Sequence, residues 1–268
     1  MSENGFAYST INNYKRSLRA SFYIAVQDDY IRKNPFDFQL NTVIDDDTVP
    51  KTILTLEQEA RLLDFAKSDT VYHKNYDEIL ILLKTGLRIS ELCGMTVTDL
   101  DFENHLILVN HQLLRNTELG YYIETPKTKS SERQVPMVEV TCQALKRVLA
   151  VQNQNECVEI DGYSNFLFLN RNGYPKTACD FNSILRNLIK KYNKCHEEKL
   201  PHITPHTLRH TFCTNCANAG MNPKALQYIM GHANITMTLN YYAHATCNSA
   251  MEEMKRLEKE QQARCLVL

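Results

Sequence analysis

The chain has 268 residues, of which 43% are hydrophobic and 23% charged, proportions that are ordinary for a globular domain. Its net charge of -1 excludes a generally basic polypeptide, and no apolar run approaches the roughly 20 residues that span a bilayer. The opening MSENGFAYST carries no signal-peptide core, and nine scattered cysteines favour a reducing compartment over a disulfide framework. We therefore expect a cytoplasmic protein with no membrane partner.

The first part of the chain predicts a helix, a linker and a second helix. Helical spacing of apolar residues covers 8–31, and Pro35 ends that segment because the residue before a proline avoids the helical region. The acidic stretch 38–51 has no periodicity and is interpreted as a linker. Thr55 is a natural N-cap for the next helix, with Gln58 three residues later as its capping-box partner.

The remainder predicts a mainly helical domain that contains one small antiparallel sheet, an α+β fold. A buried helix starts near Tyr76 and stops at Gly86, and a short helix follows it. Alternating segments within 105–137 predict three antiparallel strands. Thr204 with Pro205, and Asn222 with Pro223, are helix starts. The further predicted helices cover 139–151, 176–193, 205–219 and a charged final helix at 246–263.

Positive charge gathers in one part of the chain. Residues 171–224 carry nine Lys or Arg against three acidic residues. Such a segment fits either a basic face that meets phosphates or an ordinary solvated surface.

Four segments concentrate groups suited to binding an anion. TGLRISEL places Arg88 just after a glycine stop, where its guanidinium fork could be held rigidly towards a phosphate or form a surface ion pair. ETPKTKSSERQVP places Lys127, Lys129 and Arg133 in a predicted turn between strands. Each of these segments on its own is weak evidence for a site.

The other two segments lie near the end of the chain. PHTLRHTF places His206 and Arg209 on one face at a helix start, beside the partly positive helix N-terminus. GHANITMTLNYYAHA contains His232 and the pair Tyr241 and Tyr242. On a helix, adjacent tyrosines point about 100° apart, so one could pack inward while the other faces a cleft.

Two alternatives compete for these histidines and helices. His202, His206 and His210 with Cys213 and Cys216 could hold zinc, but Pro205 starts the helix after His202 and no second CxxC is present. The segment NPKALQYIMGHANITMTLNYY also has the pattern of a helix-turn-helix. Its second helix has no Arg or Lys with which to read bases.

In this order, the four segments resemble the boxes of the tyrosine recombinase (phage-integrase) family, most closely integrases of conjugative transposons. The resemblance implies a catalytic domain over 52–245, preceded by a partial helical core-binding domain at 1–37 and the linker at 38–51. The resemblance also implies that the tail 246–268 is a helix exchanged between protomers. The family has more helices in its core-binding domain than the one stretch found before this linker.

The resemblance also assigns roles. Tyr242 would be the nucleophile that forms a 3′-phosphotyrosyl bond, with the phosphate held by Arg88 and Arg209. Lys127 would protonate the leaving oxygen, His206 and His232 would assist proton transfer, and Lys129 and Arg133 would contact DNA. Lys129 remains an alternative acid to Lys127, and Tyr241 remains an alternative nucleophile to Tyr242.

The resemblance further implies a site-specific DNA recombinase that integrates or excises a mobile element without a metal, another cofactor or ATP. Its partners would be double-stranded DNA and three further copies of the chain in a synaptic homo-tetramer. Off DNA the chain would be a dimer or a monomer. An accessory directionality factor would be a further partner. The setting would be the nucleoid of a bacterial cytoplasm. The alternative is a DNA-binding regulator on the same scaffold that does not cleave.

Overall fold

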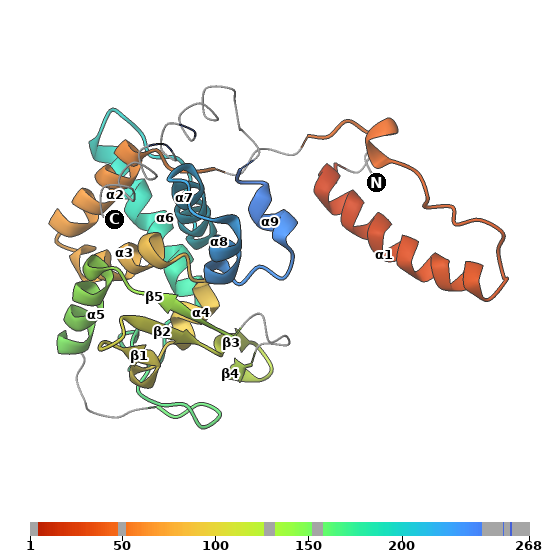
Figure 1. Cartoon of the computed structure of the whole chain (residues 1–268). Helices are drawn as coiled ribbons and strands as arrows, with labels where there is room; N and C mark the ends of the chain where they lie inside the picture. The colour runs from red at the N-terminus through yellow and green to blue at the C-terminus, as the bar shows by residue number, and fades with distance from the viewer. Residues whose placement is uncertain are drawn as a thin grey trace. The chain divides into compact units, whose positions relative to one another are not determined.

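The structure is a computed structural model that describes residues 5–47, 52–125, 132–151, 158–242, 254 and 258. The chain divides into two compact units, Met1–Lys51 and Thr52–Leu268. Figure 1 shows the helix of the first unit and the helices and sheets of the second. The predicted final helix at 246–263 lies outside the described residues except for Met254 and Glu258.

The first unit contains one long helix, α1 (Tyr8–Gln27), and a short 3-10 turn, η2 (Leu40–Thr42). The helix ends earlier than the predicted residue 31, because Asp29 adopts a positive φ of 59° that breaks the helical path. The returning chain packs back on α1, where the Phe22 and Phe36 rings meet edge to face at 5.0 Å. Nδ2 of Asn34 donates to the Arg19 carbonyl at 2.8 Å.

Helices form most of the second unit. The Thr55–Gln58 capping box is confirmed, since each side chain accepts from the other residue's backbone N–H, at 3.1 and 3.2 Å. The predicted starts at Pro205 and Pro223 are also confirmed. The helices are α2 (Leu56–Ser68), α3 (Tyr76–Thr85), α4 (Ile89–Gly94), α5 (Glu139–Val151), α6 (Ala178–Cys195), α7 (Pro205–Asn218), α8 (Pro223–Met230) and α9 (Ile235–Leu239), with the 3-10 turns η3 (His73–Asn75) and η4 (Val97–Asp99).

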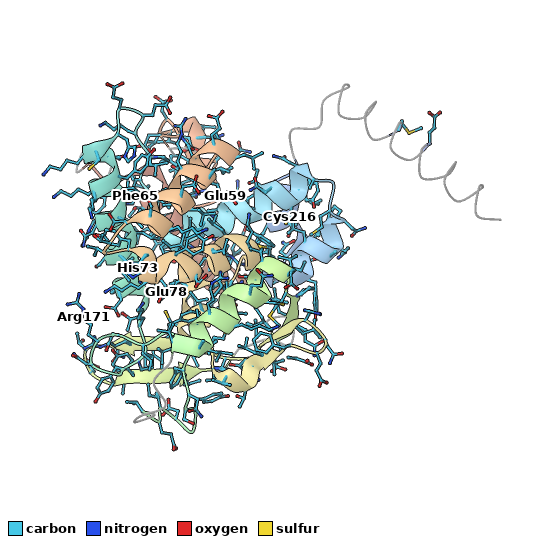
Figure 2. All side chains as sticks on the ribbon, turned by 90° about the vertical axis from the view of Figure 1, so that its left-hand side faces the viewer. Glu59, Phe65, His73, Glu78, Arg171 and Cys216 are labelled. Atoms are coloured by element: carbon cyan, nitrogen blue, oxygen red, sulfur yellow. The ribbon has the colours of Figure 1, made fainter. Side chains whose placement is uncertain are left out.

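Helix α3 is the centre of this unit. Its residues 79–83 are all buried, and the helix packs against α2, α5 and α7. Buried carboxylates tie its neighbours to it. Glu59 on α2 accepts from Lys84 at 2.5 Å and from Asn215 on α7 at 3.1 Å, and Glu78 on α3 accepts from Asn75 at 2.8 Å (Figure 2). Through Glu59 on α2, these bonds fix α7 against α3. They thereby determine where the residues that follow these helices are placed.

The strands differ from the prediction of one three-stranded sheet. The strands β1 (Leu100–Asp101), β2 (Leu106–Val109) and β5 (Arg133–Pro136) form one antiparallel sheet in the order β1-β2-β5. A separate hairpin pairs β3 (Gln112–Asn116) with β4 (Gly120–Glu124). The first part of the region 105–137, predicted to hold three strands of one sheet, is therefore divided between β2 and β3.

The break has a packing cause at His111. Its Nε2 atom lies 2.7 Å from the Gly94 carbonyl oxygen and its ring is buried, so the chain turns towards α4 at this point. Gly94 permits the approach of β3, since a Cβ there would lie 2.8 Å from the Leu113 nitrogen. Strand β5 returns beside β2 and also packs against α8. Its first residue, Arg133, is thus delivered to the end of α8.

Candidate active site

Two left-handed glycines shape the site. Gly86 ends α3 with φ 64°, and a Cβ there would meet the Phe212 ring at 2.3 Å. Two residues later Arg88 is the N-cap of α4. Its guanidinium donates to Glu91 Oε1 at 2.8 Å and to the Gly231 carbonyl at 2.7 Å. The Arg88 guanidinium is thus held between Glu91 and the Gly231 carbonyl, and the alternative of an ion pair is present with a buried carboxylate as its partner.

Glu91 is a buried carboxylate between two arginines. Arg133 donates to both Glu91 carboxylate oxygens, at 2.9 and 2.8 Å, and the Arg88 guanidinium also donates to Oε1 of Glu91. Burial raises the pKa of this carboxyl, but the hydrogen bonds and charge of Arg133, with the charge of Arg88, hold the pKa at about 2. Glu91 is therefore ionised across the physiological range. It lies three residues after Arg88, one helical turn away, which is the signal by which the sequence could have revealed it.

Helix α7 supplies the second arginine of the site. Arg209 is 5% exposed, and its guanidinium donates to the carbonyls of Gly86 and Met230. Desolvation, with the nearby charge of Arg88, lowers its pKa to about 10, which still leaves it charged at neutral pH. Arg209 thus joins the turn before Arg88 to the end of α8.

Each backbone carbonyl at the C-terminal end of α8 accepts a hydrogen bond. Gly231, at φ 58°, closes the helix, and the N–H groups of Gly231 and His232 bond the carbonyls of Tyr228 and Gln227. The next three carbonyls each accept from a different arginine. These bonds run from Arg133 to Ile229 at 2.7 Å, from Arg209 to Met230, and from Arg88 to Gly231 at 2.7 Å. Cations are favoured here because a helix C-terminus is partly negative.

His232 follows directly on this end of α8 and is buried. Its Nδ1 lies 2.9 Å from the Thr238 hydroxyl, which orients the ring. Burial, and the charges of Arg209, Arg88 and Arg133, lower its pKa to about 4. The imidazole is thus neutral at neutral pH. Arg88, Arg209 and His232 are therefore brought together, as the sequence predicted.

His206 occupies a different position. It is exposed in the first turn of α7, three residues before Arg209. This spacing puts it one turn from Arg209 towards the open end of the helix. Its imidazole is thus accessible to solvent in the first turn of α7.

The tyrosines are not on a helix, contrary to the prediction. Helix α9 ends at Leu239, and both residues lie in the turn that follows. The Tyr241 hydroxyl is hydrogen-bonded to Nδ1 of His210, and the Tyr242 hydroxyl donates to the Met221 carbonyl at 2.6 Å. Both rings are half-buried against Met230 and its neighbours on α7 and α8. Burial raises the pKa of Tyr241 to about 12 and also raises that of Tyr242.

The basic side chains of the ETPKTKSSERQVP segment divide into two groups. Lys127 and Lys129 lie outside the described residues. The prediction that Arg133 lies in a turn is wrong, because this residue is the first of β5 and its side chain is fully buried. It is directed at Glu91 and α8, so the expected surface contact between Arg133 and DNA is wrong for this structure.

The basic stretch 171–224 is likewise not one continuous surface. Lys176 pairs with Glu78 and is largely buried, and Arg209 lies inside the site. Lys191 pairs with Asp69 at 2.5 Å. Arg171 is exposed and projects from the edge of the domain in Figure 2. The positive charges of this stretch are therefore divided among the interior, ion pairs and the exposed surface.

The zinc and helix-turn-helix alternatives concern residues of α7, α8 and α9. Within residues 5–47, 52–125, 132–151 and 158–242, no three His, Cys, Asp or Glu side chains are grouped to hold a metal ion. Burial raises the pKa of Cys213 to about 12, which keeps it a thiol. The α8–α9 pair packs together through a glycine turn, and α9 spans only five residues. No helix in the described ranges is long and apolar enough to cross a membrane.

Comparisons with known proteins agree with this arrangement. The profile of the Phage integrase family matches residues 52–249. The transposase from transposon Tn916 of Enterococcus faecalis is 74% identical over 267 residues, which is all of this chain and 66% of that protein. Tyrosine recombinase XerC of Bacillus subtilis is 26% identical over 244 residues, covering 91% of this chain and 73% of that one. The chain thus spans just under two thirds of its Tn916 relative.

Solved structures extend the likeness to three dimensions. The Tn1549 transposon integrase, in complex with a circular intermediate DNA, superposes with a TM-score of 0.90 at 64% identity. The match covers 96% of this chain and 82% of that one. A complex of the same integrase with transposon right end DNA matches with a TM-score of 0.90 at 63% identity. Since the family profile covers most of the chain and the likeness extends to the fold, the chain belongs to the phage integrase family.

Proposed function

We propose that the chain is a site-specific DNA strand-transfer enzyme that cleaves and rejoins DNA through a 3′-phosphotyrosyl intermediate, in the integration or excision of a transposon. The observation that carries the proposal is the convergence of Arg88 and Arg209 on adjacent carbonyls of one helix end, beside His232. Guanidiniums anchored in this way meet the charge that develops on a phosphate without rearranging. The proteins similar to this chain include an integrase solved with a circular intermediate and with a transposon end.

In the proposed reaction, the phenol oxygen of Tyr242 attacks phosphorus and the bond from phosphorus to the 5′-oxygen breaks. The phenol proton passes to a base, and the leaving oxygen takes up a proton. Attack by a 5′-hydroxyl reverses both steps, so each phosphoester is exchanged for another and no ATP is needed. Arg88 and Arg209 hold the non-bridging oxygens through those N–H groups that the carbonyls do not use.

Proton transfer falls to groups around this pair. A phenol with a raised pKa is protonated at neutral pH, so its attack requires a base or a strongly cationic setting. His206, exposed one turn from Arg209, and neutral His232 are assigned to this part of the reaction. Lys127 is proposed as the acid for the leaving oxygen, with Lys129 as the alternative.

Tyr242 is preferred to Tyr241 on two grounds. The Tn1549 integrase was solved with an arginine replaced by lysine and, separately, with a tyrosine replaced by phenylalanine. Those two positions are separated by the same number of residues as Arg88 and Tyr242 are in this chain. In addition, the Tyr241 hydroxyl is bound to the half-buried side chain of His210, whereas the Tyr242 hydroxyl bonds the Met221 carbonyl among the described residues.

The remaining proposals concern the assembly. Residues 1–37 are proposed to be part of a DNA-clamping domain, 38–51 a linker and 246–268 a tail that is exchanged between protomers. A homo-tetramer on paired DNA sites, with an accessory directionality factor, completes the proposal. The proposed setting is the bacterial cytoplasm, at the nucleoid.

The test is a nicked duplex that carries a transposon end, on which cleavage releases a short fragment and traps the covalent complex. We expect an adduct that survives denaturing electrophoresis and maps to Tyr242, without added metal. Tyr242→Phe should abolish it and Tyr241→Phe should not. The opposite pattern would reject the assignment of the nucleophile. DNA binding without any adduct would favour the non-cleaving regulator.

A further inference from the structure

Arg133 is bound to the protein frame through all three nitrogens of its guanidinium. Its Nε donates to the Ile229 carbonyl at 2.7 Å, and both terminal nitrogens donate to Glu91, at 2.9 and 2.8 Å. The side chain is 0% exposed. A guanidinium in this position is shielded from any DNA phosphate, in contrast to Arg88, whose side chain is 33% exposed.

We infer that Arg133 is a positioning residue for strand transfer, which leaves the charge of Arg88 available to a phosphate and keeps Arg88 correctly placed, by pairing with Glu91 and by fixing the end of α8. The inference rests on the proposed function, because Arg88 matters to it as a phosphate ligand. It assigns Arg133 no contact with DNA or with the reacting atoms.

Arg133 first affects the net charge around Arg88. Glu91 is buried and bonded to both arginines, so the three groups together carry one net positive charge. Without Arg133, Glu91 and Arg88 would form a neutral pair, and the buried carboxylate would draw the Arg88 guanidinium towards itself. A lysine at 133 restores the charge but cannot supply the two parallel N–H donors of a guanidinium fork.

Arg133 also fixes the position of the α8 end that binds Arg88 and Arg209. The Gly231 carbonyl that receives Arg88 and the Met230 carbonyl that receives Arg209 follow directly on Ile229, which Arg133 binds. The β5 backbone supports the same contact, since the Gln134 N–H donates to the Tyr228 hydroxyl at 3.0 Å. The fit is close, because a Cβ on Gly231 would lie 2.9 Å from Nη1 of Arg133. Movement of the α8 end would therefore displace both phosphate ligands and His232 together.

The central experiment measures the single-turnover rate of adduct formation on the nicked duplex for the wild type and for Arg133→Lys. We expect the variant to react ~10- to 100-fold more slowly, because a displacement of about 1 Å in a reacting constellation has effects of this size. Its dissociation constant for uncleaved DNA should change by less than about threefold, since affinity follows the phosphate contacts, which Arg133 does not make.

The matched control is Arg147→Lys. Arg147 on α5 also donates to both oxygens of a carboxylate, that of Asp77, at 3.1 Å from its Nε, but lies on a different part of the domain. This variant should form the adduct at the rate of the wild type. A loss equal to that of Arg133→Lys would overturn the inference, because it would show a general sensitivity to the loss of an arginine fork.

Two further measurements separate positioning from mere folding. On a duplex whose scissile phosphate carries a methyl group in place of one charged oxygen, the deficit of Arg133→Lys should shrink, because the reaction then depends less on the charge of Arg88. The double variant Glu91→Gln with Arg133→Gln leaves no unpaired buried charge, so it should react faster than Arg133→Gln alone. Thermal unfolding of each variant reports the folded fraction.

The outcomes are distinct. If the wild type forms no adduct, the proposed function fails. If the wild type reacts and Arg133→Lys reacts equally fast, the inference fails and the function stands. If the rate falls only in proportion to the folded fraction, or the deficit is unchanged on the methylated phosphate, Arg133 is structural and the inference is overturned.

Discussion

The two halves of the site are held in different ways. Arg209, Arg133 and His232 are nearly or fully buried, and the arginines are fixed to carbonyls of the α3 and α8 ends. Tyr241 and Tyr242 follow the five-residue helix α9 and are half-buried, and each hydroxyl is engaged by a neighbour that lies elsewhere in the chain.

This difference has a physical basis. A buried guanidinium must be hydrogen-bonded and balanced, so the charged half of the site is built rigidly into the frame. A phenol is neutral and can rest against a carbonyl at little energetic penalty. In the proposed reaction the Tyr242 hydroxyl must therefore leave the Met221 carbonyl, whereas Arg88 and Arg209 are already anchored.

The largest expected effect comes from breaking the rigid half. Arg209→Lys removes the fork that bonds Gly86 and Met230 together, and an ammonium cannot hold both carbonyls and a phosphate. We expect adduct formation to slow by roughly 100- to 1000-fold, the usual effect of losing one preorganised donor. Single-turnover kinetics on the nicked duplex measure this. A loss below about tenfold would contradict the preorganised frame.

Gly231→Ala tests how tightly the frame is packed. A side chain at φ 58° is strained by about 1–2 kcal/mol, and the new Cβ would also press on Arg133. The free energy of unfolding, measured with urea, should fall by about 1–3 kcal/mol. Gly173→Ala is the control, because its φ of 78° brings the same strain with nothing within 4 Å. Equal losses would show that the approach of Arg133 adds nothing.

The tyrosine half should separate stability from chemistry. Tyr241→Phe and Tyr242→Phe each remove one hydrogen bond, so each should lower the free energy of unfolding by about 1 kcal/mol or less. Only Tyr242→Phe should abolish the adduct. Urea unfolding together with adduct formation in the same preparations checks both statements. A strong loss of adduct with Tyr241→Phe would show that its bond to His210 places the nucleophile.

A further expected effect is on the pH dependence of stability. His232 has its pKa lowered to about 4 in the folded chain, against about 6.5 when unfolded. Between these values the unfolded chain binds more protons, so stability falls as pH falls from about 6.5 to about 4. His232→Asn should flatten the slope of unfolding free energy against pH in that window. Glu91, with its pKa near 2, acts in a lower window, below about 4.5.

Local signals in the sequence determined much of the helical frame. The Thr55 capping box, the prolines at 205 and 223 and the glycine stop at 86 all act within one turn of the chain, so they can be recognised without a partner. The order of Arg88, Arg209 and His232 also followed from short motifs, and the structure brings these three together. Such signals do not depend on what packs against them.

Only the tertiary structure decided the division of the strands, the turn that carries Tyr241 and Tyr242, and the role of Arg133. The chain breaks between β2 and β3 because His111 is buried beside Gly94. Arg133 appears on the sequence as one more basic residue near a turn. It becomes part of the site because β5 carries it 42 residues from Glu91 in sequence to within hydrogen-bonding distance. Pairing across such distances depends on the packed core, which periodicity and motifs do not describe.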